Sequence, residues 1–203
     1  MLHPLVEDHS QVKRDTRRKQ AEVELILPVL NAEDDVRALL AEAVAGLATL
    51  DGPGALAVVD RGSSDRTIEV VDDFAGESPV PVRVLGCSAP GWGAGALRGI
   101  RSSRAALVGV GEPGGFRAGL EHAVRLLTGG QHIVCLGAEG SRATLLHREV
   151  AELVFGDEPP EHAGFVPALR DIAGHAGIRM TAHGRIRVAD PTDRTVVLSR
   201  ARP

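Results

Sequence analysis

The chain has 203 residues, of which 43% are hydrophobic and 25% are charged, with a formal net charge of −4 at pH 7. This composition is ordinary for one soluble globular domain, and the acidic balance argues against electrostatic binding to nucleic acid. Only 2% of the residues are aromatic, so the core must be built from aliphatic side chains.

The sequence shows no sign of a membrane span or a metal-binding cysteine motif. No apolar run reaches the ~18 residues that a membrane helix needs. Cys87 and Cys135 are widely separated and lie in apolar surroundings, which is typical of core residues. Residues 1–20 lack the apolar centre of a signal peptide. We therefore expect a cytoplasmic protein without a transmembrane segment.

Residues 1–20 are predicted to form a flexible polar arm, and residues 21–203 a single domain. The arm carries a basic cluster between Lys13 and Lys19. A solvated arm is the simpler interpretation. The alternative is attraction to an anionic membrane surface, which would place the protein peripherally on the inner face of the membrane.

Strand and helix patterns alternate along the first part of the chain. An apolar run predicts a strand at 23–31, and Asn31 is expected to cap the helix that follows. Helical spacing covers 36–50, and a second buried strand runs over 56–60. A right-handed strand–helix–strand unit is therefore expected over residues 23–60.

The alternation continues to the end of the chain. The further elements predicted are a helix from residue 68, a strand at 80–85, a glycine-rich segment at 90–100 that opens a helix, a strand at 105–110, a helix at 116–127, a strand at 133–136, helices at 145–154 and 165–176, and a hairpin of 185–188 with 195–198. This pattern predicts a single α/β domain with a mostly parallel central sheet, helices on both faces and a C-terminal β-hairpin.

One stretch organises the candidate site. Asp60 follows a buried strand, and ligands of open α/β sheets bind at the carboxyl ends of strands. Residues 58–67 read V-V-D-R-G-S-S-D-R-T, with Ser63 or Ser64 expected to cap the next helix. A plainer alternative is that Asp60 and Asp65 only shape this turn.

The same stretch resembles the V-V-D-D-G-S-x-D-x-T signature of family 2 glycosyltransferases, which include polyprenyl-phosphate mannose and glucose synthases. Arg61 stands in place of the second aspartate of the signature. The resemblance implies a GT-A-like (Rossmann-like) fold. It also implies that Asp60 hydrogen-bonds the nucleotide base, with Gly62 and Ser63 in the same binding turn.

Two further segments resemble the family in the expected order. Pro28 and Asn31 are similar to its P-x-x-N-E opening, with Glu33 one place later than the usual glutamate. Residues 90–100 are similar to its G-x-G-x-A-L-x-x-G segment, which implies that Gly93, Gly95 and Arg98 contribute to the nucleotide site. Glycines let backbone approach a ligand, and a helix start offers N–H groups to phosphate. The alternative is that these glycines serve close helix packing.

The largest departure from the family concerns its metal site. The family ends the strand at 105–110 with an Asp-x-Asp motif that holds Mn²⁺ or Mg²⁺ against the donor diphosphate. Here the matching residues are Gly111, Glu112 and Pro113. Glu112 is therefore the one carboxylate in this motif that is left as a candidate ligand for a divalent metal cofactor.

An acidic loop follows the predicted helix at 145–154. Its position resembles the acceptor side of the family, where a carboxylate acts as general base on the acceptor hydroxyl. Asp157, Glu158 and Glu161 are the candidates, and a base must reach the proton that it removes. The alternative is that all three are solvated loop charges.

Two functional hypotheses of different class follow. The first is a glycosyltransferase that takes a sugar from a UDP- or GDP-sugar by inverting displacement, with an unknown acceptor for which the family suggests lipid phosphates. The second is a catalytically degenerate relative that binds a nucleotide, a sugar or a protein. A dinucleotide-binding protein is disfavoured, because its glycine motif should follow the first strand. Pairing of exposed hairpin edges would give a homodimer.

Overall fold

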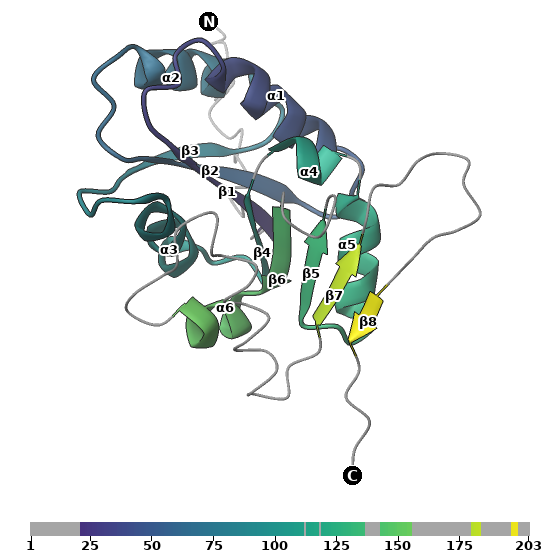
Figure 1. The fold of residues 1–203 in the computed structure, drawn as a ribbon. Helices are drawn as coiled ribbons and strands as arrows, with labels where there is room; N and C mark the ends of the chain where they lie inside the picture. The colour runs from purple at the N-terminus through teal and green to yellow at the C-terminus, as the bar shows by residue number, and fades with distance from the viewer. Residues whose placement is uncertain are drawn as a thin grey trace, which may run out of the picture.

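The computed structural model describes residues 21–111, 113–117, 119–136, 143–155, 180–183 and 196–198. The strands are β1 (Val23–Val29), β2 (Gly54–Asp60), β3 (Val82–Gly86), β4 (Leu107–Gly111), β5 (Ile133–Leu136), β6 (Ala143–His147), β7 (Met180–His183) and β8 (Val196–Leu198). The helices are α1 (Val36–Leu47), α2 (Thr67–Glu77), α3 (Trp92–Ser102), α4 (Pro113–Arg117), α5 (Leu120–Thr128) and α6 (Arg148–Phe155) (Figure 1).

These strands form one sheet in the order β3-β2-β1-β4-β6-β5-β7-β8. The first four are parallel, β6 runs antiparallel to both of its neighbours, and β5 pairs with β7 in parallel. The predicted α/β domain with a mostly parallel sheet is confirmed. Strand order reverses between β1 and β4, which is the kind of switch point where open sheets bind ligands.

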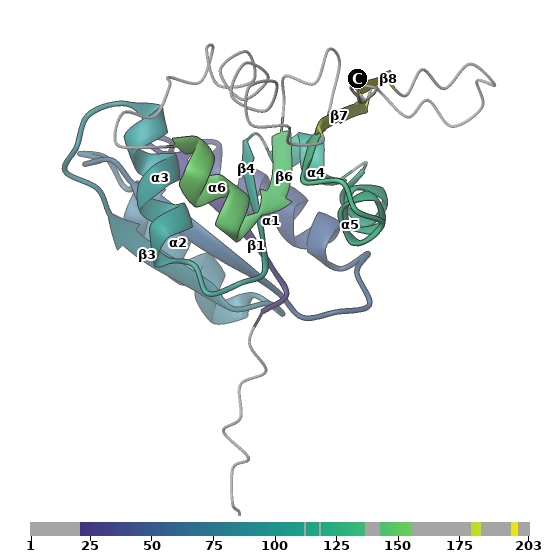
Figure 2. The same ribbon diagram turned by 90° about the horizontal axis from the view of Figure 1, so that it is seen from below.

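Helices cover both faces of the sheet, as predicted. Along the central strands, alternate residues belong to two separate clusters of buried side chains. In β1, Leu25 and Leu27 face the layer of α1, α2, α4 and α5, whereas Ile26 faces α3 and α6. Figure 2 shows α3 and α6 side by side on their face. Within the described residues, no helix is long and apolar enough to cross a membrane.

Two predicted elements differ from the structure, and the C-terminal hairpin is described only in part. Residues 143–147 form β6 instead of the start of a helix, because Leu145 and Leu146 are buried on opposite faces of the sheet; a short apolar run does not distinguish these two states. The predicted helix at 116–127 consists of α4 and α5. The C-terminal strand β8 lies within the predicted 195–198 and pairs antiparallel with β7. The predicted arm at 1–20, helix at 165–176 and strand at 185–188 lie outside the described residues.

Helix α3 lies close against the sheet because two of its glycines face the strands. A Cβ atom on Gly99 would overlap the side chain of Ile26, and one on Gly95 would lie 3.0 Å from Cβ of Pro28. Both glycines are buried. The packing interpretation of this segment is therefore supported at these two positions, and it brings the start of α3 over the carboxyl ends of β1 and β2.

An ion pair between a buried carboxylate and a partly exposed guanidinium ties β1 to β3 beneath the end of α3. Arg83 donates to Glu24 through Nε (2.7 Å) and Nη2 (3.0 Å), and Nη2 also donates to Oγ of Ser102 at 3.0 Å. Glu24 is only 5% exposed. The register places Ala55 beside Glu24 and Ala57 beside Arg83, so the intervening strand carries small side chains at these positions.

We predict that Arg83→Met lowers the free energy of unfolding by about 2–3 kcal/mol, because it leaves the carboxylate of Glu24 buried without its partner. Urea denaturation measures this change. Arg37→Met is the matched control, because Arg37 pairs with Glu77 at an exposed position and such pairs contribute about 1 kcal/mol or less. Equal losses in the two variants would contradict a special role for the buried pair.

Candidate functional site

The candidate site begins where the loops after β1 and β2 meet. We call residues 30–35 the first loop and residues 61–66 the second loop. The backbone N–H of Asn31 donates to Oγ of Ser63 at 3.0 Å, and the backbone N–H of Ser64 donates to Oδ1 of Asn31 at 2.8 Å. Asn31 has a φ of 47°, a left-handed conformation that asparagine tolerates better than most residues. The two loops therefore hold each other by reciprocal hydrogen bonds.

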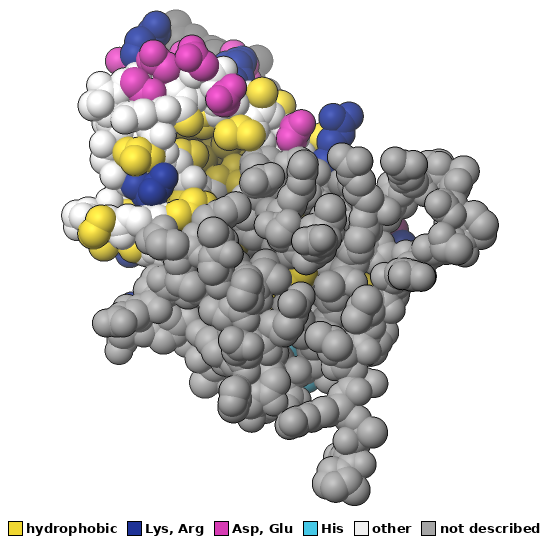
Figure 3. Space-filling model, in the orientation of Figure 1, with side chains coloured by type: hydrophobic (Ala, Val, Ile, Leu, Met, Phe, Trp, Pro, Cys, Tyr) yellow, Lys and Arg dark blue, Asp and Glu magenta, His cyan; other side chains and the backbone are white. Residues whose placement is uncertain are grey.

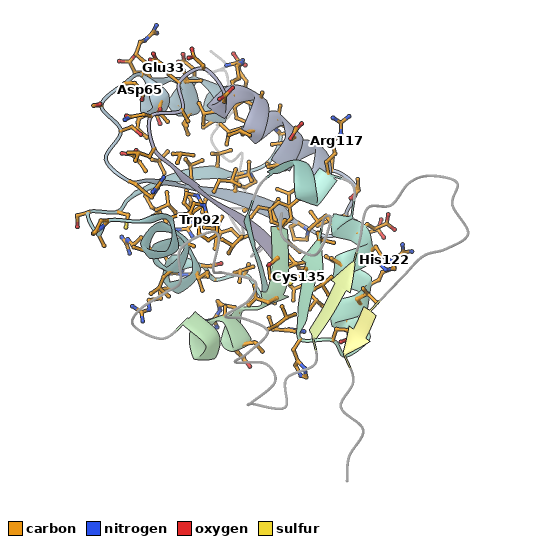
Figure 4. The ribbon with its side chains drawn as sticks, in the orientation of Figure 1. Glu33, Asp65, Trp92, Arg117, His122 and Cys135 are labelled. Atoms are coloured by element: carbon orange, nitrogen blue, oxygen red, sulfur yellow. The ribbon has the colours of Figure 1, made fainter. Side chains whose placement is uncertain are left out.

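A second set of contacts extends this connection to the start of α2. Asp65 accepts from the backbone N–H of Glu33 at 3.1 Å, and Glu33 accepts from the backbone N–H of Arg66 at 2.9 Å. The hydroxyl of Thr67 is buried between the loops: it donates to Asp65 and accepts from the N–H of Ala32 at 2.7 Å. Figure 4 shows Glu33 and Asp65 next to each other at this edge.

The predicted capping roles of these residues are wrong. Asn31 and Ser63 join the two loops, and neither α1 nor α2 has a side-chain hydrogen bond at its N-cap residue. The reason is tertiary. The carboxyl ends of two neighbouring parallel strands bring the loops within hydrogen-bond reach, so polar side chains that favour caps find partners in the other loop.

Asp60 is half-buried at the end of β2. Its Oδ1 accepts from the backbone N–H of Ser63 at 3.0 Å, and Gly62 provides the positive φ of 90° that the turn requires. Within the described chain, its Oδ2 accepts no hydrogen bond. The turn-shaping role of Asp60 is thus present, and one carboxylate oxygen is left over.

The glycine-rich start of α3 lies beside this turn. Gly93 and Gly95 are buried, and Gly91 has a φ of 93°. The position of a Cβ on Gly95 would be close to Pro28 and to the stem of Arg61, with Cδ of Arg61 at 3.2 Å. The first turn of α3 contains no acidic residue.

Arg98 follows one turn later on α3. It is exposed, and its Nε donates to the carbonyl of Gly86 at 3.4 Å, at the end of β3. The predicted nucleotide-site residues therefore gather at the carboxyl ends of β1, β2 and β3; they are Pro28, Asn31, Asp60, Gly62, Ser63, Gly93, Gly95 and Arg98. Their binding roles remain predictions.

Two features of this site were not predicted from the sequence. The first is that Asp65 and Glu33 each accept a backbone hydrogen bond from the other loop. The second is that the side chain of Arg61 packs against Gly95 of α3. The alternation of side chains after Val59, which faces α3, is the signal that would have directed Arg61 to that face.

The predicted metal and base residues lie outside the described residues, so their positions stay predictions. These residues are Glu112, Asp157, Glu158 and Glu161. No group of three or more His, Cys, Asp or Glu residues that could hold a metal occurs in the ranges described. Strand β4 ends at Gly111 with a φ of 141°, a conformation that a side chain such as aspartate adopts only with strain. The described residues thus assemble no divalent metal site, and Glu112, the candidate ligand, lies outside them.

Charge is unevenly distributed around the two loops. Acidic side chains gather over α1 and α2, and below them the surface is hollowed over apolar side chains (Figure 3).

The hydroxyl of Thr67, followed by the N–H groups of Thr67 and Glu33, holds the pKa of Asp65 below its usual range, although partial desolvation opposes this shift. Glu69 raises the pKa of Arg66.

We predict that Asp65→Asn reduces stability at neutral pH and removes part of its acid dependence. Because the pKa of Asp65 is lowered in the folded state, its contribution is complete above about pH 4, the usual unfolded value, and is lost as pH falls through the lowered pKa. Urea denaturation between pH 2.5 and 7 should show the two proteins converging at the acid end. Asp72→Asn, at an exposed position on α2, is the control. If Asp65→Asn differs from the unchanged protein by the same free energy of unfolding at every pH, the pH-dependent role of Asp65 is contradicted.

Comparison with known proteins was informative only at the level of structure. No family model matches the sequence, and no curated protein matches it. Mannosyltransferase PcManGT from Pyrobaculum calidifontis, solved in complex with GDP-Man and Mn²⁺, is similar with a TM-score of 0.65 and 18% identity. The match covers 80% of this chain and 55% of the mannosyltransferase, so this chain spans about half of that protein's length.

Two other solved structures support the same fold. Glucosyl-3-phosphoglycerate synthase from Mycobacterium tuberculosis, in complex with Mn²⁺, UDP and glucosyl-3-phosphoglycerate, has a TM-score of 0.58 and 18% identity over 90% of this chain and 73% of the synthase. Residues 1–349 of S. aureus TarS have a TM-score of 0.54 and 15% identity over 73% of this chain and 55% of TarS. Likeness at these identities establishes the fold, and the predicted GT-A-like fold is confirmed.

Proposed function

We propose that this domain binds a nucleotide-diphosphosugar at the carboxyl ends of β1 and β2 and transfers the sugar to an acceptor. The observation that carries the proposal is Asp60: Ser63 fixes its carboxylate, and its Oδ2 is left without a partner in the described chain. The residue stands at the carboxyl end of β2, one strand from the switch point between β1 and β4, in a sheet whose fold is shared with a mannosyltransferase solved with GDP-Man.

In this proposal each part of the site has a separate task. The free oxygen of Asp60 accepts a hydrogen bond from an N–H group of the base. The backbone N–H groups at the start of α3 bind the diphosphate. The two joined loops keep both parts in a fixed relation before the ligand arrives, which lowers the cost of ordering them on binding.

The transfer step would be a direct displacement at the anomeric carbon. The acceptor hydroxyl loses its proton to a general base, its oxygen forms the new bond, and the nucleoside diphosphate leaves with the electron pair of the broken bond. Asp157 and Glu158 stay the candidates for the base. Because Glu112 lies outside the described residues, no step is assigned to it or to a divalent metal.

The second candidate is a binding module without turnover. Gly111 favours it, because this position has a backbone conformation that resists the first aspartate of the family's metal motif. The two candidates share the nucleotide site and differ in release of the diphosphate, so binding and turnover must be measured separately.

Calorimetric titration with UDP, GDP and their common sugar conjugates, each with and without Mn²⁺, tests the proposal. We predict micromolar to millimolar binding of at least one diphosphate, weakened about tenfold or more in Asp60→Asn, because the amide replaces a charged acceptor. Asn retains an oxygen that can accept from Ser63, so the turn should survive. Asp51→Asn, in the exposed connection at the opposite edge of the sheet, is the matched control.

Three outcomes are informative. Binding together with release of nucleoside diphosphate in an acceptor screen supports the transferase. Binding without any such release supports the binding module. No binding of any nucleotide by the unchanged protein contradicts the transferase and leaves the binding module only a sugar or a protein as its ligand.

A further inference from the structure

Arg61 carries an unsatisfied donor inside the candidate site. Its Nε is buried and has no hydrogen-bond partner, a condition shared within the described chain only by Oε1 of Gln131. Buried polar atoms in folded proteins are nearly always paired, so an orphaned guanidinium nitrogen beside a ligand site needs an explanation.

Packing fixes Arg61 without the help of an ion pair. Its backbone N–H donates to the carbonyl of Val29 at 3.0 Å. Its Cγ and Cδ lie 3.3 and 3.2 Å from the position that a Cβ on Gly95 would take. The stem is thus held between the end of β2 and the first turn of α3, which directs the guanidinium to the glycine-rich side of the site.

The charge of Arg61 is not neutralised by the described residues around it. Arg61 forms no ion pair there, whereas Arg66 on the same loop pairs with Glu69 at 2.9 Å. Within the described residues, the carboxylate of Asp60 accepts from the N–H of Ser63 and forms no ion pair with Arg61, and the first turn of α3 carries no acidic side chain. A fixed, unpaired guanidinium is the donor group best suited to an oxyanion such as phosphate.

Strand alternation separates Arg61 from Asp60. Val58 faces the α1 side of the sheet and Val59 faces the α3 side, so Asp60 and Arg61 continue to opposite sides. A ligand that is neutral at one end and anionic at the other matches this arrangement. A nucleoside diphosphate has this form, with its base at one end and its phosphates at the other.

We propose that Arg61 binds the phosphate oxygens of the nucleoside diphosphate whose base is held by Asp60. This inference rests on the proposed function and adds a protein-borne positive charge at a position where the resembling family has an aspartate. Arg61 thereby makes binding of the diphosphate independent of a divalent metal.

The test compares diphosphates with their nucleosides in the presence of EDTA. Arg61→Met retains the apolar stem over Gly95 and removes the charge, and Arg61→Lys retains a charge without the planar fork. We expect Arg61→Met to bind UDP or GDP about 10- to 100-fold more weakly while uridine or guanosine binding is unchanged. The affinity of Arg61→Lys for the diphosphate should lie between those of the unchanged protein and Arg61→Met. Arg125→Met, at an exposed position on α5, is the control for loss of one positive charge.

The outcomes separate this inference from the proposed function. If the unchanged protein binds UDP or GDP and Arg61→Met binds it equally well, the inference is wrong and the proposed function stands. If Arg61→Met weakens nucleosides as much as diphosphates, Arg61 does not contact phosphate. If the unchanged protein binds neither diphosphate, with EDTA or with Mn²⁺, both are wrong. Thermal unfolding followed by circular dichroism confirms that each variant is folded.

Discussion

The reciprocal hydrogen bonds between the loops after β1 and β2 are the constraint on which the candidate site depends. Asn31 and Ser63 join the loops at one point, and Asp65 joins them at another. The mutual contacts between the loops fix the turn that follows Asp60. The turn holds the Asp60 carboxylate, which is the proposed hydrogen-bond acceptor for the base of the ligand.

The glycines of α3 complete the site from the other side of the sheet. Helix packing and ligand binding were alternative explanations of this segment, and the structure makes them compatible. Gly95 and Gly99 are needed for the close approach of α3 to Pro28 and Ile26. That same approach brings the start of α3 next to Arg61, so residues selected for packing also define the shape of the proposed phosphate site.

Much of the fold follows from local patterns, because apolar periodicity reports burial directly. The apolar runs that predict β1 and β2 and the helical spacing of α1 are confirmed. Strand β6 was not predicted, because two adjacent leucines, Leu145 and Leu146, fit the periodicity of a strand and of a helix equally well. The partners of Asn31 and Ser63 could not be predicted, since they depend on which loops meet in space. The position of Asp60 was predictable from the end of an apolar run, whereas the orphaned Nε of Arg61 is a property of the packed structure alone.

The central claim is that one nucleotide spans Asp60 and Arg61. A crystal structure of the protein with UDP or GDP, grown in EDTA, tests it most directly. The account predicts the base within hydrogen-bond distance of Oδ2 of Asp60 and the diphosphate against the guanidinium of Arg61 at the start of α3. A nucleotide bound elsewhere, or bound here with its phosphates directed away from Arg61, would contradict it.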